Sequence, residues 1–180
     1  STQSNRGIYL MLTSVLVFML FPATRRSPTE RFSIFDIGMV VLTIAVFSYW
    51  IDQYVSYAMF RGSSPNQTDL IMVSLAILLL LETSRRALGP VISLIAIAFL
   101  LQLYYGQYLP GRLSHPGMSI ERILEFTYST QEAIFGVVTA TFATFVFPFM
   151  IFGAFLERSG AGKFFMDLGT AVAGRWRGGP

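Results

Sequence analysis

Long apolar stretches alternate with short polar ones along the whole chain, and this alternation predicts its architecture. A helix that crosses the hydrocarbon core of a bilayer needs about 20 predominantly apolar residues, with a lower limit near 17. The intervening stretches hold basic residues or Gly and Pro, as loops between membrane helices do. We therefore expect about five membrane-crossing helices, over residues 7–23, 35–57, 68–81 (continuing to the arginine pair at 85–86), 87–105 and 133–156.

The composition supports a membrane protein and argues against several other classes of protein. Hydrophobic residues make up 53% of the chain and charged residues only 13%, whereas a soluble domain carries about 25% charged residues. The net charge of +3 does not indicate nucleic-acid binding, because the arginines sit at the edges of apolar blocks rather than in one patch. The chain has no cysteine and one histidine, which excludes disulfides and leaves little for a zinc site. We expect an all-α integral protein of the lipid bilayer.

Basic residues give the predicted helices an orientation. With the amino terminus outside, nine lysines and arginines fall in inside segments and four in outside segments, which is the bias that sets membrane topology. The inside set is Arg25, Arg26, Arg31, Arg85, Arg86, Arg158, Lys163, Arg175 and Arg177, and the outside set is Arg6, Arg61, Arg112 and Arg122. Aromatic residues end the second and fourth helices on the predicted outer face, as an interfacial belt would: Tyr49, Trp50, Tyr54, Tyr57, Tyr104, Tyr105 and Tyr108.

Two further segments are amphipathic without being long enough to span. Ser119 can cap a helix in which Ile120, Ile123, Leu124 and Tyr128 share one face. Residues 163–173 form the second, with an apolar stripe of Phe164, Phe165, Leu168 and Val172 and with turns allowed by Gly160, Gly162 and Gly174. We expect both to lie as interfacial helices on the membrane surface.

Pro148 interrupts the fifth predicted helix. It leaves the carbonyl of Thr144 without its usual amide partner, and that carbonyl must find another partner in hydrocarbon. The functional interpretation is a hinge or a helix that lines a pathway. The alternative is an ordinary packing helix with a tolerated kink, because proline is common in membrane helices.

Charged side chains avoid the centres of the predicted spans. Asp36 and Asp52 flank the apolar middle of the second helix, and Glu82 can pair with Arg85 or Arg86 at helical spacing. Glu157 and Arg158 end the fifth helix. We favour boundary ion pairs over ligand binding for all of these, and we expect His115, in a Pro-Gly loop, to be solvated.

Catalysis is the weakest interpretation of the polar residues. The sequence shows no paired carboxylates on one buried face, no cluster of metal ligands and no nucleophile beside a base. We therefore expect no enzyme, no catalytic or metal-binding residue and no cofactor.

Several short motifs resemble one transporter family. Residues 153–160 read Gly-Ala-Phe-Leu-Glu-Arg-Ser-Gly, and residues 174–179 read Gly-Arg-Trp-Arg-Gly-Gly. This pair is similar to a pattern in the large membrane subunit of tripartite ATP-independent periplasmic (TRAP) transporters. Residues 81–89, 108–111 and 132–136 resemble the branch in which small and large subunits are fused and which works with a TAXI-type substrate-binding protein.

The resemblance implies a division of the chain and a transport function. Residues 1–65 would be the small-subunit-like (Q-type) region, and residues 66–180 the start of a large-subunit-like (M-type) region. The family implies secondary active import of small organic acids such as dicarboxylates, driven by a sodium or proton gradient, in the inner membrane of a bacterium or archaeon. A soluble periplasmic receptor would deliver the substrate.

The resemblance assigns no ion or substrate ligand to these residues, because the family's sites would follow Pro180 in the remainder of the permease. It gives Arg158, Ser159 and Gly160 a structural role, in which they close one helix and orient the next. This portion would be scaffold and receptor-docking face. The alternative is a membrane scaffold or assembly subunit that transports nothing.

Overall fold

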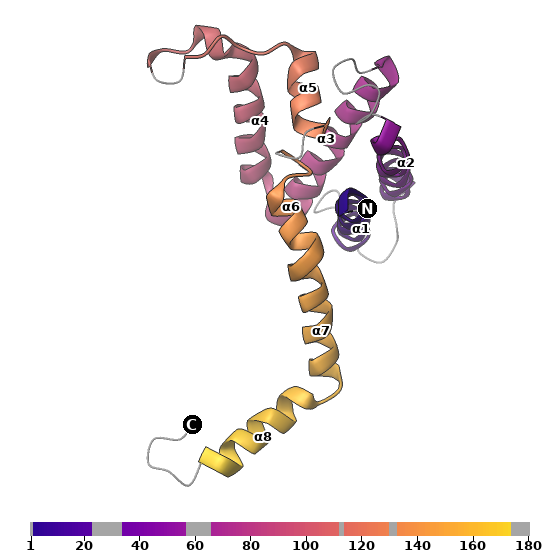
Figure 1. Cartoon of the computed structure of the whole chain (residues 1–180), viewed down its shortest axis with the longest axis vertical. Coiled ribbons are helices and arrows are strands. Elements are labelled where there is room, and N and C mark those ends of the chain that lie inside the picture. Colours follow the sequence, from indigo (N-terminus) through magenta and orange to yellow (C-terminus); the bar gives the residue numbers. More distant parts are fainter. Residues whose placement is uncertain (1, 23–33, 57–65, 112–113, 130–132, 174–180) are drawn as a thin grey trace. The chain divides into compact units, whose positions relative to one another are not determined.

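A computed structural model describes residues 2–22, 34–56, 66–111, 114–129 and 133–173, and every regular element in these ranges is helical (Figure 1). The chain divides into two compact units, Ser1–Ala140 and Thr141–Pro180. The elements are α1 (Thr2–Leu20), α2 (Ile34–Ser56), α3 (Gln67–Leu88), α4 (Pro90–Tyr105), a 3-10 turn (Gly106–Tyr108), α5 (Ile120–Ser129), α6 (Val137–Thr141), a π-helical turn (Phe142–Val146), α7 (Phe147–Arg158) and α8 (Ala161–Ala173).

Three of the predicted spans are long and apolar enough to cross a membrane: Ile34–Gln53, Pro90–Tyr108 and Val137–Arg158. The first predicted span is a shorter apolar helix, Ser4–Leu20, and the end predicted for it at Ala23 lies outside the described residues. The third predicted span, α3, carries Asp69 in its first turn and two arginines in its last. The all-helical membrane class is therefore confirmed, while the number of five spans stays a prediction.

Two predicted boundaries were wrong. Ala87 and Leu88 belong to α3 rather than to the next helix, because Gly89 breaks the chain there with φ +90° and Pro90 starts α4. Glycine adopts this φ without the steric cost of a side chain, and proline suits the first turn of a helix because it has no N–H to satisfy. The fifth span begins at Val137 rather than at Ala133, because the residues before it form a turn.

The core of the first unit lies between α1, α2, α3 and the turn before α6. Its fully or nearly buried members are Phe18, Val46, Phe47, Trp50, Val73, Ala76, Leu79 and Phe135. Close approach of α1 to α2 depends on Gly7, since a Cβ there would lie only 3.0 Å from side-chain atoms of Trp50 and Ile51. The helices on both sides of residue 65 therefore share one core.

The helix α5 is not a separate interfacial helix. Ser119 caps it as predicted, accepting a hydrogen bond from the Arg122 amide at 3.3 Å. Its apolar face is packed rather than presented to lipid: Ile123 is buried and Leu124 packs against the core, while Ile120 stays exposed. In Figure 1 the helix runs alongside α4, and it contacts both α3 and α4. A helix lying in the membrane interface would instead cross the spanning helices, so this prediction is corrected.

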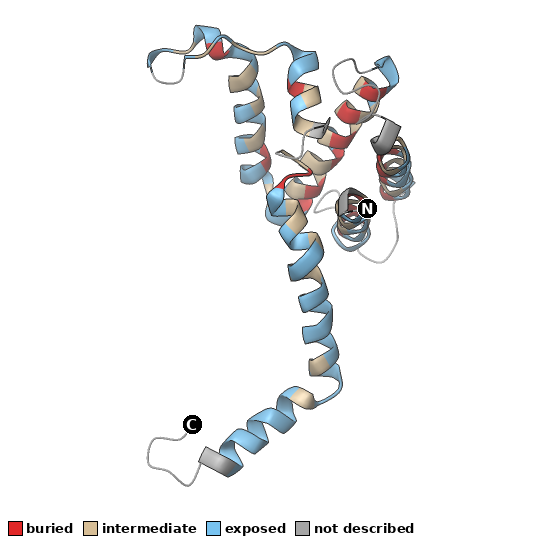
Figure 2. Ribbon diagram, viewed as in Figure 1, coloured by how far each residue is buried: buried red, intermediate tan, exposed pale blue. Residues whose placement is uncertain are grey.

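In the second unit, α7 is followed by α8 after a sharp bend, and the described residues of both helices are exposed or half-buried (Figure 2). Gly160 makes the bend with φ +77°, as the glycine at this position predicted. Gly174, predicted to end the second amphipathic helix, lies outside the described residues.

Candidate functional site

A charge cluster, buried at Arg86 and Asp36 and open to solvent at Arg85, joins the amino end of α2 to the carboxyl end of α3. Arg86 donates from Nη1 to Asp36 Oδ1 at 2.7 Å and from Nε to Glu82 Oε1 at 2.8 Å. Arg85 forms a two-pronged contact with Glu82, with both donor–acceptor distances at 2.7 Å. The predicted pairing of Glu82 with Arg85 or Arg86 is therefore present with both arginines.

Arg86 is the centre of this cluster. Its side chain is 0% exposed and that of Asp36 is 9% exposed. Its guanidinium lies 4.9 Å from the centre of the Phe18 ring and donates to the Phe21 carbonyl at 3.1 Å. Arg86 therefore also contacts the carboxyl end of α1. One nitrogen, Nη2, is buried without a hydrogen-bond partner. Because burial of an ion pair costs solvation, the pair fixes which ends meet more than it adds stability.

Asp36 could not be chosen as the partner of Arg86 from spacing alone, since 50 positions separate the two residues. The only available signal was that each stands at a helix end: Asp36 in the first turn of α2 and Arg86 in the last turn of α3. The helix dipole favours a carboxylate at the amino end of a helix and a cation at its carboxyl end. Asp52, the other acidic residue of α2, is exposed, and its Oδ2 accepts from the side-chain Nε2 of Gln53 at 2.9 Å.

A second polar contact ties α2 to α3 at the opposite end of each helix. The Tyr49 hydroxyl donates to Asp69 Oδ1 at 2.7 Å, and Asp69 Oδ2 accepts from the Asn66 amide at 3.0 Å. Asp69 therefore caps its own helix and holds a neighbouring one at the same time. No role was predicted for Asp69 from the sequence, because nothing near this residue indicates a contact with another helix.

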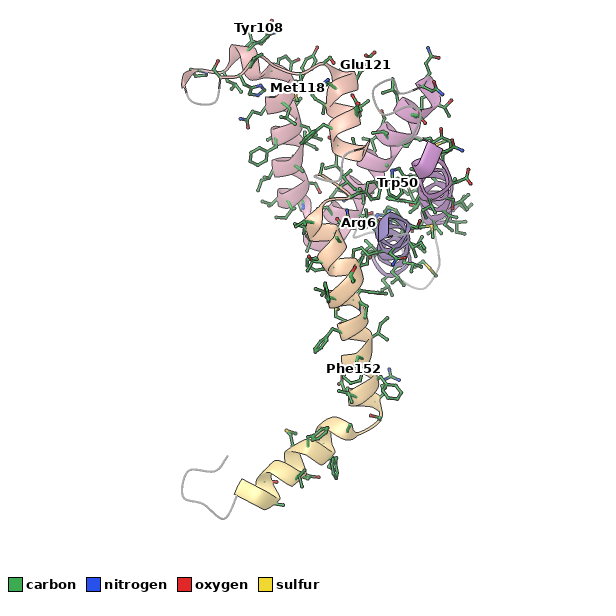
Figure 3. The ribbon with its side chains drawn as sticks, viewed as in Figure 1. Arg6, Trp50, Tyr108, Met118, Glu121 and Phe152 are labelled. Atoms are coloured by element: carbon green, nitrogen blue, oxygen red, sulfur yellow. The ribbon has the colours of Figure 1, made fainter. Side chains whose placement is uncertain are left out.

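Phe135 fixes the turn that precedes α6. Its ring stacks on Trp50 with the centroids 3.7 Å apart, and its carbonyl accepts from Arg6 Nη1 at 2.5 Å. Figure 3 shows Arg6 and Trp50 on the neighbouring helices α1 and α2. Trp50 was predicted to stand in an interfacial aromatic belt, and this was wrong for the residue: it is buried in the core, since a large ring gains more by packing against Phe135.

His115 is not simply solvated, contrary to the prediction. Its ring packs against Gly106 so closely that a Cβ on this glycine would overlap it. Nδ1 accepts from the Gly117 amide at 3.2 Å, and Nε2 lies 3.1 Å from the Gln102 carbonyl. Since Nδ1 accepts, the proton is on Nε2 and is donated to that carbonyl. The Pro-Gly pattern predicted the loop but gave no sign that the ring would fold back onto α4.

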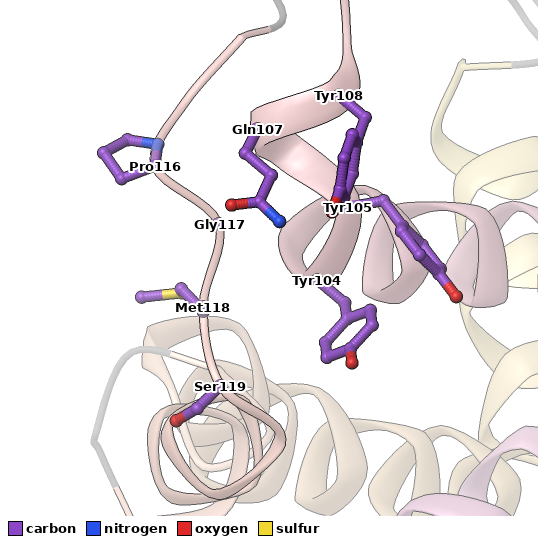
Figure 4. Close-up of a pocket in the computed structure, with 8 residues that line it drawn as sticks. All are labelled: Tyr104, Tyr105, Gln107, Tyr108, Pro116, Gly117, Met118 and Ser119. Carbon is purple, nitrogen blue, oxygen red and sulfur yellow. The ribbon is translucent and has the colours of Figure 1, made fainter.

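The three tyrosines at the end of α4 and in the 3-10 turn line a pocket of about 320 Å³ together with Gln107 and residues 116–119 (Figure 4). Tyr104, Tyr105 and Tyr108 are 41%, 50% and 75% exposed, and their place in an interfacial aromatic belt stays a prediction. Tyr104 and Tyr105 meet edge to face, with centroids 4.8 Å apart. Tyr54 and Tyr57 cannot be compared, because their side chains fall outside the described residues.

Pro148 lies in the first turn of α7, directly after a π-helical turn. The Phe147 amide bonds to the Phe142 carbonyl five positions before it, which widens the helix by one residue. A wider turn makes room for a proline ring that would otherwise meet the preceding carbonyl. The structure thus shows a helix defect at the predicted place, and its role as a hinge stays a prediction.

The predicted Glu157–Gly160 motif forms the bend between α7 and α8. The Ser159 amide donates to the Phe155 carbonyl at 2.9 Å, and the Gly160 amide to the Glu157 carbonyl at 3.2 Å. The Ser159 hydroxyl also donates to the Leu156 carbonyl at 3.0 Å. These bonds satisfy carbonyls at the end of α7, and the Phe164 amide bonds to the Gly160 carbonyl at the start of α8. The motif is therefore built to close one helix and begin another.

Comparison with known proteins gives one positive finding. Residues 75–180 match the family model described as "Tripartite ATP-independent periplasmic transporter, DctM component". No curated protein and no solved structure matches the chain. The family is one of inner-membrane permease components, which work with a periplasmic binding protein and other subunits. The match covers more than half of the residues of this chain, and the chain therefore belongs to the DctM family of TRAP transporter permeases.

Proposed function

We propose that this chain is the amino-terminal part of a fused TRAP permease of the TAXI-type branch, and that its first unit is the static scaffold of the transporter. Residues 1–65 are then the Q-type region and residues 66–180 the opening of the M-type region. The whole permease imports small organic acids by symport with sodium ions or protons, after a TAXI-type receptor delivers them.

The observation that carries the fused arrangement is the Arg86–Asp36 pair. It joins α2, on the Q-type side, to α3, on the M-type side, through two side chains that are almost completely buried. The Tyr49–Asp69 bond and the shared core repeat the connection elsewhere along the same helices. Removal of the partner from either side would leave a buried charge without its counter-charge, which supports permanent association of the two regions in one chain.

The static role of the first unit is supported by where its polar groups lie. Among its described residues, the buried charged side chains Asp36, Asp69 and Arg86 each have a polar partner within the protein, and no described group of three or more His, Asp or Glu side chains converges as a metal site would. A pathway for ions or carboxylates needs polar groups that open to the translocated solute. We therefore place the ion and substrate ligands in the remainder of the permease.

The test is uptake of radiolabelled organic acids by the full-length permease in proteoliposomes, with and without its soluble receptor, across imposed sodium and proton gradients. We expect uptake only when both the receptor and one ion gradient are present. Uptake without a receptor would reject the tripartite assignment. Absence of uptake with every receptor and gradient would favour the alternative, a membrane scaffold or assembly subunit without transport activity.

A further inference from the structure

We propose that the tyrosine surface, formed by Tyr104, Tyr105, Gln107, Tyr108, Met118 and Ser119 at the end of α4, is the surface on which the soluble periplasmic receptor docks, and that His115 holds it in shape. This inference rests on the proposed receptor-dependent function and adds the residues that would carry the contact. It is argued from the local geometry, the chemistry of the exposed groups and the predicted side of the membrane.

The loop at residues 115–118 folds back and forms hydrogen bonds with the end of α4. The last carbonyls of a helix have no partner within it, and here two of them are taken by the loop. His115 Nε2 lies 3.1 Å from the Gln102 carbonyl, and the Met118 amide donates to the Leu103 carbonyl at 2.9 Å. The His115 amide also donates to the Gly106 carbonyl at 3.1 Å. A surface held in this way is ordered before a partner arrives, which lowers the entropy cost of docking.

The groups that this surface presents are those that favour protein contacts. Tyrosine is enriched at the energetic centres of interfaces, because it offers a large rigid ring and a hydroxyl that can bond. The three rings, the Gln107 amide and the Ser119 hydroxyl border the pocket of about 320 Å³, which has room for one side chain of a partner. None of the six residues of the tyrosine surface is charged.

Position along the chain favours a soluble partner over lipid. The tyrosine surface lies at the end of the apolar helix Pro90–Tyr108, where a span leaves the hydrocarbon. Figure 3 shows Tyr108 and Met118 at the end of the first unit where Glu121 also lies. The distribution of basic residues predicts that this end faces outside, which is the side on which a periplasmic binding protein reaches its permease.

The first experiment measures receptor affinity for the full-length permease in nanodiscs, using the substrate-binding protein that supports uptake by the wild type. We expect Tyr105→Ala and Tyr108→Ala each to weaken binding by about tenfold or more, as truncation of an aromatic anchor does. Uptake should show the same loss as a higher receptor KM with an unchanged kcat. Phe99→Ala is the matched control, because Phe99 lies on the same helix and is 62% exposed within the apolar span, where a soluble protein cannot reach.

A second pair of variants tests the positioning role of His115. Gly106→Ala places a methyl group in the volume of the ring without straining the backbone, whose φ is −52°. It should raise the receptor KM, as His115→Ala should. In the double variant the new methyl group has no imidazole ring to overlap, so the loss of receptor affinity should be no larger than that of His115→Ala alone. Gly38→Ala is the control, since nothing lies within 4 Å of a Cβ there.

The results separate this inference from the function on which it rests. Receptor-independent uptake by the wild type rejects both. Receptor-dependent uptake with unchanged affinity in the Tyr105→Ala/Tyr108→Ala double variant rejects the docking surface alone, as does equal weakening by Phe99→Ala. Additive losses from Gly106→Ala and His115→Ala contradict positioning by the ring. A cysteine introduced at Ser114 should react with a membrane-impermeant maleimide from outside, and reaction only from the inside also overturns the proposal.

Discussion

The two units of this chain use the same apolar composition in opposite ways. The first, Ser1–Ala140, buries an apolar core between α1, α2 and α3 and adds buried polar contacts such as Arg86–Asp36, although many of its other apolar side chains are exposed. The second, Thr141–Pro180, has no buried residue among those described, although its helix is as apolar as the spans of the first. Apolarity alone therefore does not distinguish a helix that packs in a core from a helix that contacts lipid or other segments. Buried polar contacts do distinguish them, because each such contact needs a partner at a fixed position.

The largest effect is expected where a buried charge loses its partner. Asp36→Asn should destabilise the full-length permease by about 3–5 kcal/mol, because Arg86 keeps its charge without the carboxylate beside it. Thermal unfolding in detergent would measure the loss. The double variant Asp36→Leu/Arg86→Met should be far less damaging, since replacing both charges removes the desolvation cost as well. A double variant as unstable as the single one would mean that the pair itself holds the helices together.

A loss of similar or slightly smaller size is expected at Phe135. Phe135→Ala removes a fully buried ring that stacks on Trp50, and such truncations cost about 3–5 kcal/mol. Phe149→Ala in the second unit is the matched comparison: that ring is 76% exposed, and its removal should change stability by less than about 0.5 kcal/mol. Equal losses at the two positions would show that the second unit is packed in the full-length protein, and the contrast between the units would then fail.

The hydroxyl of Tyr49 should contribute less. Tyr49→Phe removes the bond to Asp69 and keeps the ring, and hydrogen bonds to a charged group contribute about 1.5–3 kcal/mol. Asp69 retains the Asn66 amide, so we expect the lower end of that range, measured by the same thermal unfolding. No change would indicate that α2 and α3 are held together elsewhere.

The smallest effect on stability is expected at Pro148, whose replacement tests transport rather than packing. Pro148→Ala restores an amide donor and allows the π-helical turn to close into a regular helix. If the defect serves as a hinge, the uptake rate of the full-length permease should change while its melting temperature changes little. An unchanged rate would favour the packing interpretation.

Sequence patterns predicted the helices well, because hydrophobic length and breakers act locally. The bend at Gly160 and the break at Gly89 follow from residues within a turn of the boundary. Long-range partners were missed for the same reason: nothing near Asp36 specifies Arg86, and nothing near His115 specifies the carbonyls of α4. Trp50 shows a further limit, since an aromatic residue at a helix end can serve as an interfacial anchor or as core, and only its neighbours decide.

The central claim is that the first unit stays rigid while the permease works. Spin labels on cysteines introduced at Ile37 in α2 and Leu78 in α3, both exposed positions, would report the distance between the two proposed regions by pulsed electron paramagnetic resonance. The full-length permease would be measured in nanodiscs, alone and with receptor, substrate and coupling ion. We predict one distance distribution, unchanged in every condition. A second distance population that appears with substrate and receptor would contradict a static scaffold.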